Sequence, residues 1–325
     1  MSPAKTKAQP GAGEAVQRAR ALPWHEQLAG KLAGDCLPVA TMLVGRFADG
    51  IEQLALDIAC QSLAGTDSAA GQLLDAGSHP DLLIVRRQPS TTGKLRQEIV
   101  IDQVRELVEF MQMTPRLARI RIAVIAPACR LNRSAANSLL KILEEPPAPG
   151  RFLLAAEQPE RLPATVRSRT RIVAATAPQK QQAIDWLKKN HPQLANPQDA
   201  LTAAAGAPLA ALAMHERARE RTVFVKLVCG NADLLAAGRE LAELPIEIWL
   251  EWAQYWVSDL IAASLKLQPR IFPEAGDVPR SGNLMRLLAA GRELQEMRRL
   301  AQHPVNARQM LERVAIRLQQ LQPRS

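Results

Sequence analysis

Two glycines near the start of the chain stand at a spacing that can hold phosphate. Gly45 and Gly50 frame the loop 46–49, between an apolar run and a helical pattern. In a phosphate-binding loop the glycines let backbone N–H groups approach the oxygens, and the next two residues are a lysine and a hydroxyl that holds Mg²⁺. Here those positions are Ile51 and Glu52. Because Glu52 would occupy the anion-favouring helix N-terminus itself and repel a triphosphate, the pattern predicts a vestigial loop with no nucleotide cofactor expected.

A single arginine further along the chain is the second candidate for phosphate chemistry. Arg169 lies in the sequence Ser168-Arg169-Thr170, at the end of a segment that reads as helix, break, strand and short helix. A guanidinium offers a planar set of N–H donors that suits phosphate oxygens. The alternative, which residue statistics alone favour, is an ordinary surface arginine, because this segment also contains Arg161, Arg167 and Arg171.

Other side chains that often carry chemistry are better explained as structural. The four cysteines are scattered and form no CxxC pair, which predicts no zinc site. No nucleophile has a base that the sequence pairs with it, so His25 and His79 are interpreted as structural. Four aromatic residues recur at helical spacing: Trp249, Trp252, Tyr255 and Trp256. This spacing favours a helix-packing core or a subunit interface over a platform for base stacking.

A parallel sheet between helices is the framework that these residues require. Apolar, β-compatible runs predict about five buried strands: Val39–Gly45, Leu82–Val85, Arg121–Ala126, Phe152–Ala156 and Ile172–Ala174. Helical patterns alternate with them: Trp24–Leu32, Ile51–Leu63, a helix within Ile99–Met113 that Asp102 caps, and one that Asn132 or Ser134 caps and Pro146-Pro147 end. Right-handed crossovers then place helices on both faces of the sheet.

The sequence changes in character at Pro178. Residues 178–221 show only helical periodicity broken by prolines and glycine, which predicts a small helical domain. Residues 222–325 predict a second helical domain, with helices at Val223–Val228, Ile246–Leu267, Asn283–Leu300 and Asn306–Leu321. Residues 1–21 lack periodicity and predict a disordered tail before an α/β domain at 22–177. The expected fold class is therefore α/β plus all-α.

Composition restricts the partners and the location of the protein. The 325 residues carry a net charge of +9, which suits a partner that bears phosphates or an acidic protein. No apolar run approaches the length of a membrane span, and the first twenty residues lack the apolar core of a secretory signal. With scattered single cysteines, these features lead us to expect a soluble, cytoplasmic protein.

The segment from Leu131 to Thr170 resembles a known family. The stretch AANSLLKILEEPP, followed by FLLAAEQPERLPATVRSRT, is similar to the clamp-loader branch of the AAA+ ATPases. The resemblance is strong over about 22–176 and weak over the rest. It implies a RecA-like five-stranded sheet domain with a degenerate P-loop, a small helical lid domain, and a helical C-terminal collar that holds subunits together.

Further nucleotide-handling groups of that family are missing in this chain. The acidic pair that would hold Mg²⁺ at the end of the third strand is replaced by Ala126-Pro127. The polar sensor residue would fall at Ala156 or Glu157, and the arginine of the lid domain would fall at Leu209. Together with the altered loop, these losses predict no ATP hydrolysis, no cofactor and no metal.

The family's S-R-C motif, by contrast, is largely kept. It matches Ser168, Arg169 and Thr170, and threonine replaces a cysteine that carries no charge. The resemblance implies that Arg169 is an arginine finger that acts in trans, in the ATP site of a neighbouring subunit. The implied partners are the clamp-loader ATPase subunits of gamma/tau type and the delta subunit, with the sliding clamp and primed DNA met through the complex.

Under this interpretation the chain is an accessory subunit of a DNA-directed DNA polymerase holoenzyme, with no activity of its own. Two other functions stay open from the sequence. One is a stand-alone AAA+ protein that hydrolyses ATP. The other is a DNA-binding helical protein that uses its arginine-rich C-terminal helices, with the α/β domain as a scaffold.

Overall fold

The computed structural model describes residues 22–64, 68–89, 95–241, 243–276, 284–301 and 306–321. The chain divides into two compact units, Met1–Asn190 and His191–Ser325. The expected disordered tail, residues 1–21, lies outside the described residues. The domain boundaries that the sequence suggests after residues 177 and 221 stay predictions. No helix in the described part of the chain is long and apolar enough to cross a membrane.

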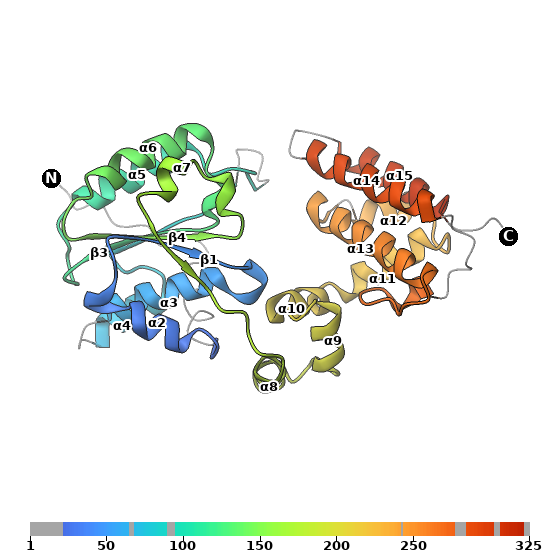
Figure 1. Cartoon of the computed structure of the whole chain (residues 1–325), viewed down its shortest axis with the longest axis horizontal. Coiled ribbons are helices and arrows are strands. Elements are labelled where there is room, and N and C mark those ends of the chain that lie inside the picture. Colours follow the sequence, from blue (N-terminus) through green and yellow to red (C-terminus); the bar gives the residue numbers. More distant parts are fainter. Residues whose placement is uncertain are drawn as a thin grey trace. The chain divides into compact units, whose positions relative to one another are not determined.

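A five-stranded parallel sheet forms the centre of the first unit (Figure 1). Its strand order is β2 (Leu82–Val85), β3 (Arg121–Ile125), β4 (Gly150–Ala156), β1 (Ala40–Val44) and β5 (Arg171–Ala174). Every neighbouring pair is parallel. The five predicted strands are therefore all confirmed, each to within two residues at either end.

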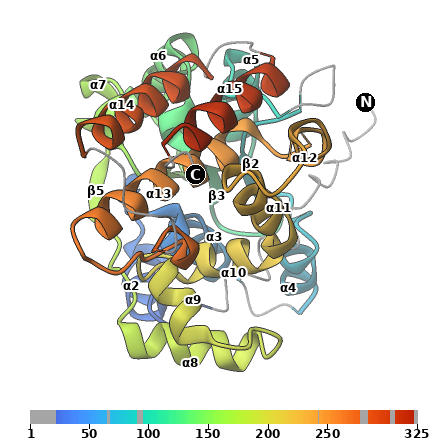
Figure 2. The ribbon, with the colours of Figure 1, turned by 90° about the vertical axis from the view of Figure 1, so that its right-hand side faces the viewer.

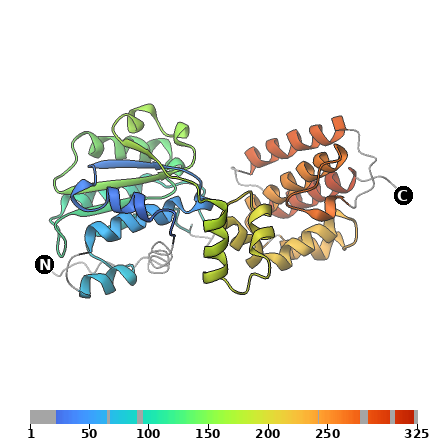
Figure 3. The ribbon, with the colours of Figure 1, turned by 60° about the horizontal axis from the view of Figure 1, so that its bottom comes forward.

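Helices cover both faces of this sheet. One layer contains α2 (Glu26–Leu32), α3 (Ile51–Leu63) and α4 (Ser68–Asp75), and the other contains α5 (Ile101–Gln112), α6 (Arg133–Glu144) and α7 (Ala164–Arg167). The tilted view of Figure 3 again places the sheet between the blue and the green helices. The last helix of the unit is α8 (Lys180–Asn190). The predicted arrangement of helices on both sides of a parallel sheet is confirmed.

Alternating strand residues supply the two cores that hold these layers. Leu43 and Leu153 pack with α3 on one face of the sheet, whereas Met42 and Leu154 pack with α5 and α6 on the other. All four side chains are fully buried. Because each strand is apolar on both faces, its sequence reads as a continuous hydrophobic run, which is why the strands could be recognised.

One predicted helix cap is wrong. Helix α5 has Val100 as its N-cap and not Asp102, which lies in the first turn of the helix. The side chain of Gln103 reaches back and accepts a hydrogen bond from the Val100 backbone N–H at 3.3 Å. A glutamine at the third helical position can satisfy a free N–H at the helix start in this way. Asp102 still has a favourable location, because the helix N-terminus attracts negative charge.

The start of α6 distinguishes between the two candidate caps. Asn132 is the N-cap, and its side-chain oxygen accepts a hydrogen bond from the Ala135 backbone N–H at 2.8 Å. Ser134 lies inside the helix. The helix ends at Glu144, immediately before Glu145 and the two prolines, as the sequence predicted.

In its described residues, the second unit consists of helices joined by turns and loops and contains no strand. Its helices are α9 (Pro197–Ala203), α10 (Pro208–Glu216), α11 (Ala218–Val228), α12 (Leu234–Leu241), α13 (Ile246–Ser264), α14 (Leu284–Leu300) and α15 (Ala307–Gln319). Figure 2 shows α14 beside α15. The helix α12 was not among those predicted. The four longer patterns correspond to α11, α13, α14 and α15, so the predicted all-α part of the fold is confirmed.

The aromatic residues of α13 form the core of this unit. Trp249 and Trp256 are fully buried, and Trp252 is 5% exposed. Phe224 of α11 packs edge-on against Trp252, with the ring centroids 5.8 Å apart. A buried indole offers no face to a nucleic-acid base, so the prediction of a helix-packing core is confirmed.

Candidate functional site

The loop after β1 has the strand–loop–helix layout of a phosphate loop. β1 leads into Gly45, a short 3₁₀ turn at Phe47–Asp49, and then α3. Gly50 is the N-cap of α3 and has a φ angle of +92°, a conformation that other residues rarely adopt. A Cβ atom at Gly50 would also collide with Leu22, and it would lie 3.5 Å from the His25 ring. The segment that precedes α2 therefore packs directly against the loop.

Polar groups within this loop are bonded to one another. The Asp49 carboxylate accepts two hydrogen bonds from the Arg46 guanidinium, at 2.7 Å and 2.9 Å. The Trp24 indole N–H donates to the Asp49 backbone carbonyl at 2.8 Å. A bidentate arginine–carboxylate pair is one of the stronger polar contacts in proteins. The Arg46 guanidinium is therefore bonded to a buried aspartate of the same loop in the place of a phosphate.

Ile51 and Glu52, at the positions that bind phosphate and Mg²⁺ in a working loop, both contact other parts of this chain. Ile51 is 1% exposed and belongs to the core under α3. The Glu52 carboxylate pairs with the Arg86 guanidinium, from the segment after β2. The Arg86 carbonyl in turn accepts a hydrogen bond from the Gln103 side chain at 2.6 Å. Both positions that a phosphate loop uses for chemistry therefore hold helix α3 in place.

A groove lies between α2, α3 and α8. Leu22 is among the residues that line it, and the same side chain lies against Gly50 of the loop after β1. The charged lining of the groove consists of three carboxylates and one ammonium: Glu26, Asp57, Asp185 and Lys189. The carboxylates outnumber the cation, so the local potential disfavours a polyphosphate. This electrostatic balance agrees with the side chains of the loop itself.

The remaining nucleotide-handling positions are apolar except Glu157, the second candidate for the sensor position, which is an exposed acidic residue. Ala126 follows β3 and is 1% exposed, and Ala156 ends β4 fully buried. Leu209 lies in the first turn of α10. Among the described residues there is no cluster of three or more His, Cys, Asp or Glu side chains that could hold a metal ion.

His25 is buried beside this loop. The residue is 1% exposed, and neither ring nitrogen has a hydrogen-bond partner within the described ranges. Burial lowers the pKa of His25 to about 4, so the imidazole is neutral at physiological pH. Its burial and its edge-on contact with Trp24 agree with the structural interpretation.

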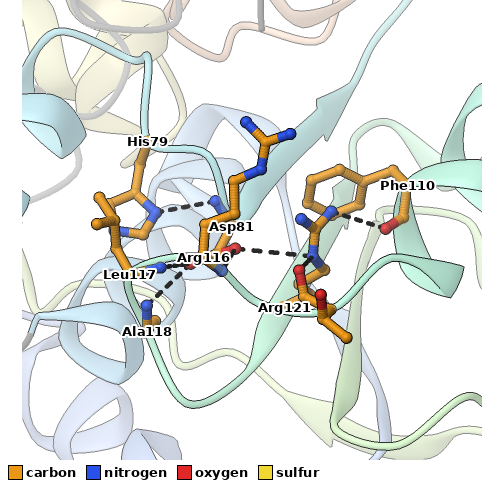
Figure 4. Close-up of polar contacts among 8 residues, drawn as sticks. His79, Asp81, Phe110, Arg116, Leu117, Ala118 and Arg121 are labelled. Atoms are coloured by element: carbon orange, nitrogen blue, oxygen red, sulfur yellow. Dashed lines mark hydrogen bonds and ion pairs between the residues drawn. The ribbon is translucent and has the colours of Figure 1, made fainter. Parts of the chain in front are cut away.

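His79 belongs to a separate network that the sequence did not reveal (Figure 4). Its Nδ1 atom accepts a hydrogen bond from the Asp81 backbone N–H at 3.1 Å. The fully buried Asp81 carboxylate accepts three backbone hydrogen bonds of 2.8 Å, from residues 116–118, and pairs with the Arg121 guanidinium at 3.6 Å. Burial lowers the pKa of His79, while the Asp81 carboxylate acts in the opposite direction.

This network lies where β2 and β3 begin, at the amino ends of the strands. The loop after β1, in contrast, lies at the carboxyl ends of the parallel strands. The three hydrogen bonds and the buried ion pair fix the segment that enters β3. The network therefore stabilises the sheet at the amino ends of β2 and β3, whereas the candidate site lies at the carboxyl ends of the strands. A buried aspartate one residue before a strand was the signal that sequence reasoning missed.

Arg169 follows the short helix α7 and lies at the protein surface. The helix is anchored by Val166, which is fully buried in the core shared with α6. The Ser168 hydroxyl donates to the Thr165 carbonyl at 3.0 Å, and the Thr170 hydroxyl donates to the Arg167 carbonyl at 3.0 Å. The two hydroxyl residues on either side of Arg169 thus stabilise the turn that presents it.

The Arg169 guanidinium contacts acceptors of its own chain, and two of these contacts are short. One terminal nitrogen, Nη2, lies 2.7 Å from Oε1 of Glu144, and the other, Nη1, donates to the Thr165 carbonyl at 3.1 Å. The Arg169 side chain is 36% exposed and the Glu144 side chain is 45% exposed. Sequence reasoning had not connected Glu144 with Arg169. Acidic residues in the last turn of α6 were the available signal, because that end of a helix favours cations.

The comparisons with known proteins agree with these observations. A family model described as DNA polymerase III, delta subunit, matches residues 24–179. The DNA polymerase III subunit delta' of Pseudomonas aeruginosa is 33% identical over 264 residues, which cover 75% of this chain and 78% of that protein. The subunit of that name from Escherichia coli is also 33% identical, over 66% of this chain and 65% of its own length.

Among solved structures, a gamma subunit-related protein of DNA polymerase III from Thermotoga maritima aligns with 93% of this chain and 99% of its own. The sequence identity is 16% and the TM-score is 0.47. The family assignment is based on the relatives found by sequence similarity and not on the Thermotoga maritima structure. The resemblance that the sequence suggested is confirmed, and the chain belongs to the family of DNA polymerase III delta' subunits.

Proposed function

We propose that this chain is a clamp-loader subunit that does not hydrolyse ATP and supplies Arg169 to the ATP site of a neighbouring subunit. Membership of the delta' family supports the clamp-loader assignment. The observation that carries the finer proposal is a difference between two sites. In the loop after β1, Arg46 binds the buried side chain of Asp49, whereas Arg169 binds the exposed side chain of Glu144 at the protein surface.

The partners in this proposal are gamma/tau-type ATPase subunits and a delta subunit, which together load the sliding clamp on primed DNA. During phosphoryl transfer, charge spreads over the oxygens of the γ-phosphoryl group, and a guanidinium placed against them stabilises it. Fingers of this kind contribute about 10³–10⁵ in rate. In this proposal, a subunit that hydrolyses no ATP itself still controls hydrolysis in its neighbour. It also stays rigid while the other subunits of the ring move to open the clamp.

Reconstitution of the full complex tests the proposal. We expect Arg169→Ala to assemble normally and to lower the hydrolysis stimulated by clamp and DNA by about 10³ or more at the one site it serves. Arg169→Lys keeps the charge but loses the planar donors, so it should restore only part of the rate. Arg161→Ala is the matched control, because Arg161 is an exposed arginine of the same segment. Unchanged hydrolysis at every site with Arg169→Ala would refute the finger.

The two other functions are less well supported. A stand-alone ATPase would need a lysine where Ile51 is buried in the core. The charge that α14 and α15 could offer to DNA is reduced, because three of their seven arginines pair with glutamates of these two helices: Arg299 with Glu296, Arg308 with Glu312 and Arg317 with Glu293. Tight binding of Mg·ATP by the isolated chain would favour the first, and salt-dependent DNA binding the second.

A further inference from the structure

Two acidic residues stand at an unfavourable end of α6. Glu144 is the last residue of this helix, and Glu145 is its C-cap. The C-terminus of a helix carries a partial negative charge, so carboxylates there are disfavoured and cations are favoured. Where a sequence breaks a local rule of this kind, a compensating contact or a functional role is expected. For Glu144 the structure supplies such a contact.

Glu144 and Thr165 hold the Arg169 guanidinium from two elements. The carboxylate at the end of α6 contacts Nη2 at 2.7 Å, and the carbonyl in α7 accepts from Nη1 at 3.1 Å. A guanidinium has five N–H groups, and these contacts, with a long one to the Ser168 hydroxyl at 3.5 Å, use only terminal nitrogens. Among the described residues the Nε–H has no partner. The group is therefore restrained while it keeps donors for another acceptor.

We propose that Glu144 is a positioning residue that aims Arg169 at the neighbouring subunit's triphosphate. This inference rests on the proposed function and deepens it. An exposed arginine without a partner distributes over many rotamers, and a displacement of the group that contacts the reacting phosphoryl lowers the rate. Both partners are more than a third exposed, so the ion pair is screened and restrains the guanidinium without locking it.

The test is ATP turnover by the reconstituted complex with Glu144→Ala and Glu144→Gln. We expect turnover stimulated by clamp and DNA to fall about two- to fivefold at the site served, which is the range of an exposed ion pair. The KM for ATP should stay unchanged, because the neighbour's own phosphate loop binds the nucleotide. Glu145→Gln is the matched control, since it removes the same charge one residue further along. Unchanged or faster turnover in both Glu144 variants would overturn the inference.

A double-mutant cycle separates positioning from a structural role. If Glu144 acts through Arg169, Glu144→Ala should lower the rate in the wild-type background and cause no further loss beside Arg169→Ala. The melting temperature of Glu144→Ala should not fall, because the substitution removes a charge that the helix end disfavours. The same fold loss in both backgrounds would overturn the inference.

These results also separate this inference from the proposal on which it rests. If Arg169→Ala lowers turnover but Glu144→Ala does not, only the role of Glu144 is overturned. If Arg169→Ala itself has no effect, the finger and the role of Glu144 are overturned together.

Discussion

The loop after β1 and the turn after α7 each contain an arginine paired with a carboxylate, and they differ in the partner. The Arg46 side chain is 43% exposed and the Arg169 side chain is 36% exposed, so exposure alone does not separate the two. The Asp49 side chain is 8% exposed and binds Arg46 through two contacts, whereas the Glu144 side chain is 45% exposed and binds Arg169 through one.

The difference supports the proposal that one residue type serves the fold in one place and a partner in another. Releasing Arg46 would leave a buried carboxylate without its cation, which is costly. Releasing Arg169 would leave two groups that water can solvate, so a triphosphate can compete for the guanidinium. The available cation is therefore the one whose own partner is exposed. Substitutions at the two sites test this contrast.

Restoring the missing side chains should not restore a nucleotide site. The double variant Ile51→Lys, Glu52→Thr rebuilds the phosphate-loop pattern but places an ammonium in the core under α3. We expect the free energy of unfolding to fall by about 3–5 kcal/mol, measured by urea denaturation, because a buried unpaired charge is strongly destabilising. Mg·ATP should still not bind. Binding with unchanged stability would mean that the loop is open, and the contrast would fail.

Acid should destabilise the unit that contains the loop, through His25. Its folded-state pKa of about 4 lies below the value of 6.5 for an exposed histidine, so the unfolded chain binds more protons between these values. The contribution of His25 to stability should therefore be constant above pH 6.5 and decline towards pH 4, by up to roughly 3 kcal/mol. The check is the unfolding free energy against pH for the wild type and for His25→Gln, which should lack most of this decline. An equal decline in both would show that His25 is not the cause.

The two carboxylates should differ in their effect on stability. Asp49→Ala removes a buried acceptor of two charged hydrogen bonds, and we expect it to cost about 1–3 kcal/mol. Glu144→Ala removes an exposed group and should change stability by less than about 0.5 kcal/mol. Thermal denaturation of the two variants beside the wild type measures both values. Equal costs would mean that both arginines are held for structural reasons.

Sequence reasoning located the parts of the site that depend on residue type and spacing. The bounds of α3 were predicted to the residue, because Gly50 precedes an amphipathic pattern that ends at Leu63. The losses at Ile51 and Glu52 were visible from chemistry alone. The strands were recognisable because both of their faces are buried.

Contacts between distant segments could not be predicted in the same way. Nothing in the local pattern shows that Trp24 donates to the Asp49 carbonyl, or that Asp81 holds residues 116–118. The Glu144–Arg169 pair joins α6 to the turn after α7 across an intervening strand. The cap assigned to Asp102 was wrong because a glutamine one residue later satisfies the helix start. Such choices depend on side-chain geometry, which a pattern of residue types does not contain.

The most direct test of the contrast compares Arg169→Ala with Arg46→Ala in otherwise identical reconstituted complexes. The neighbour's site can be isolated by replacing the phosphate-loop lysines of the other ATPase subunits, so that the measured hydrolysis comes from one site. We predict that Arg169→Ala lowers this hydrolysis by about 10³ or more, whereas Arg46→Ala leaves it unchanged and lowers only the melting temperature of this chain. Equal hydrolysis in the two complexes, or a loss with Arg46→Ala alone, would contradict the account.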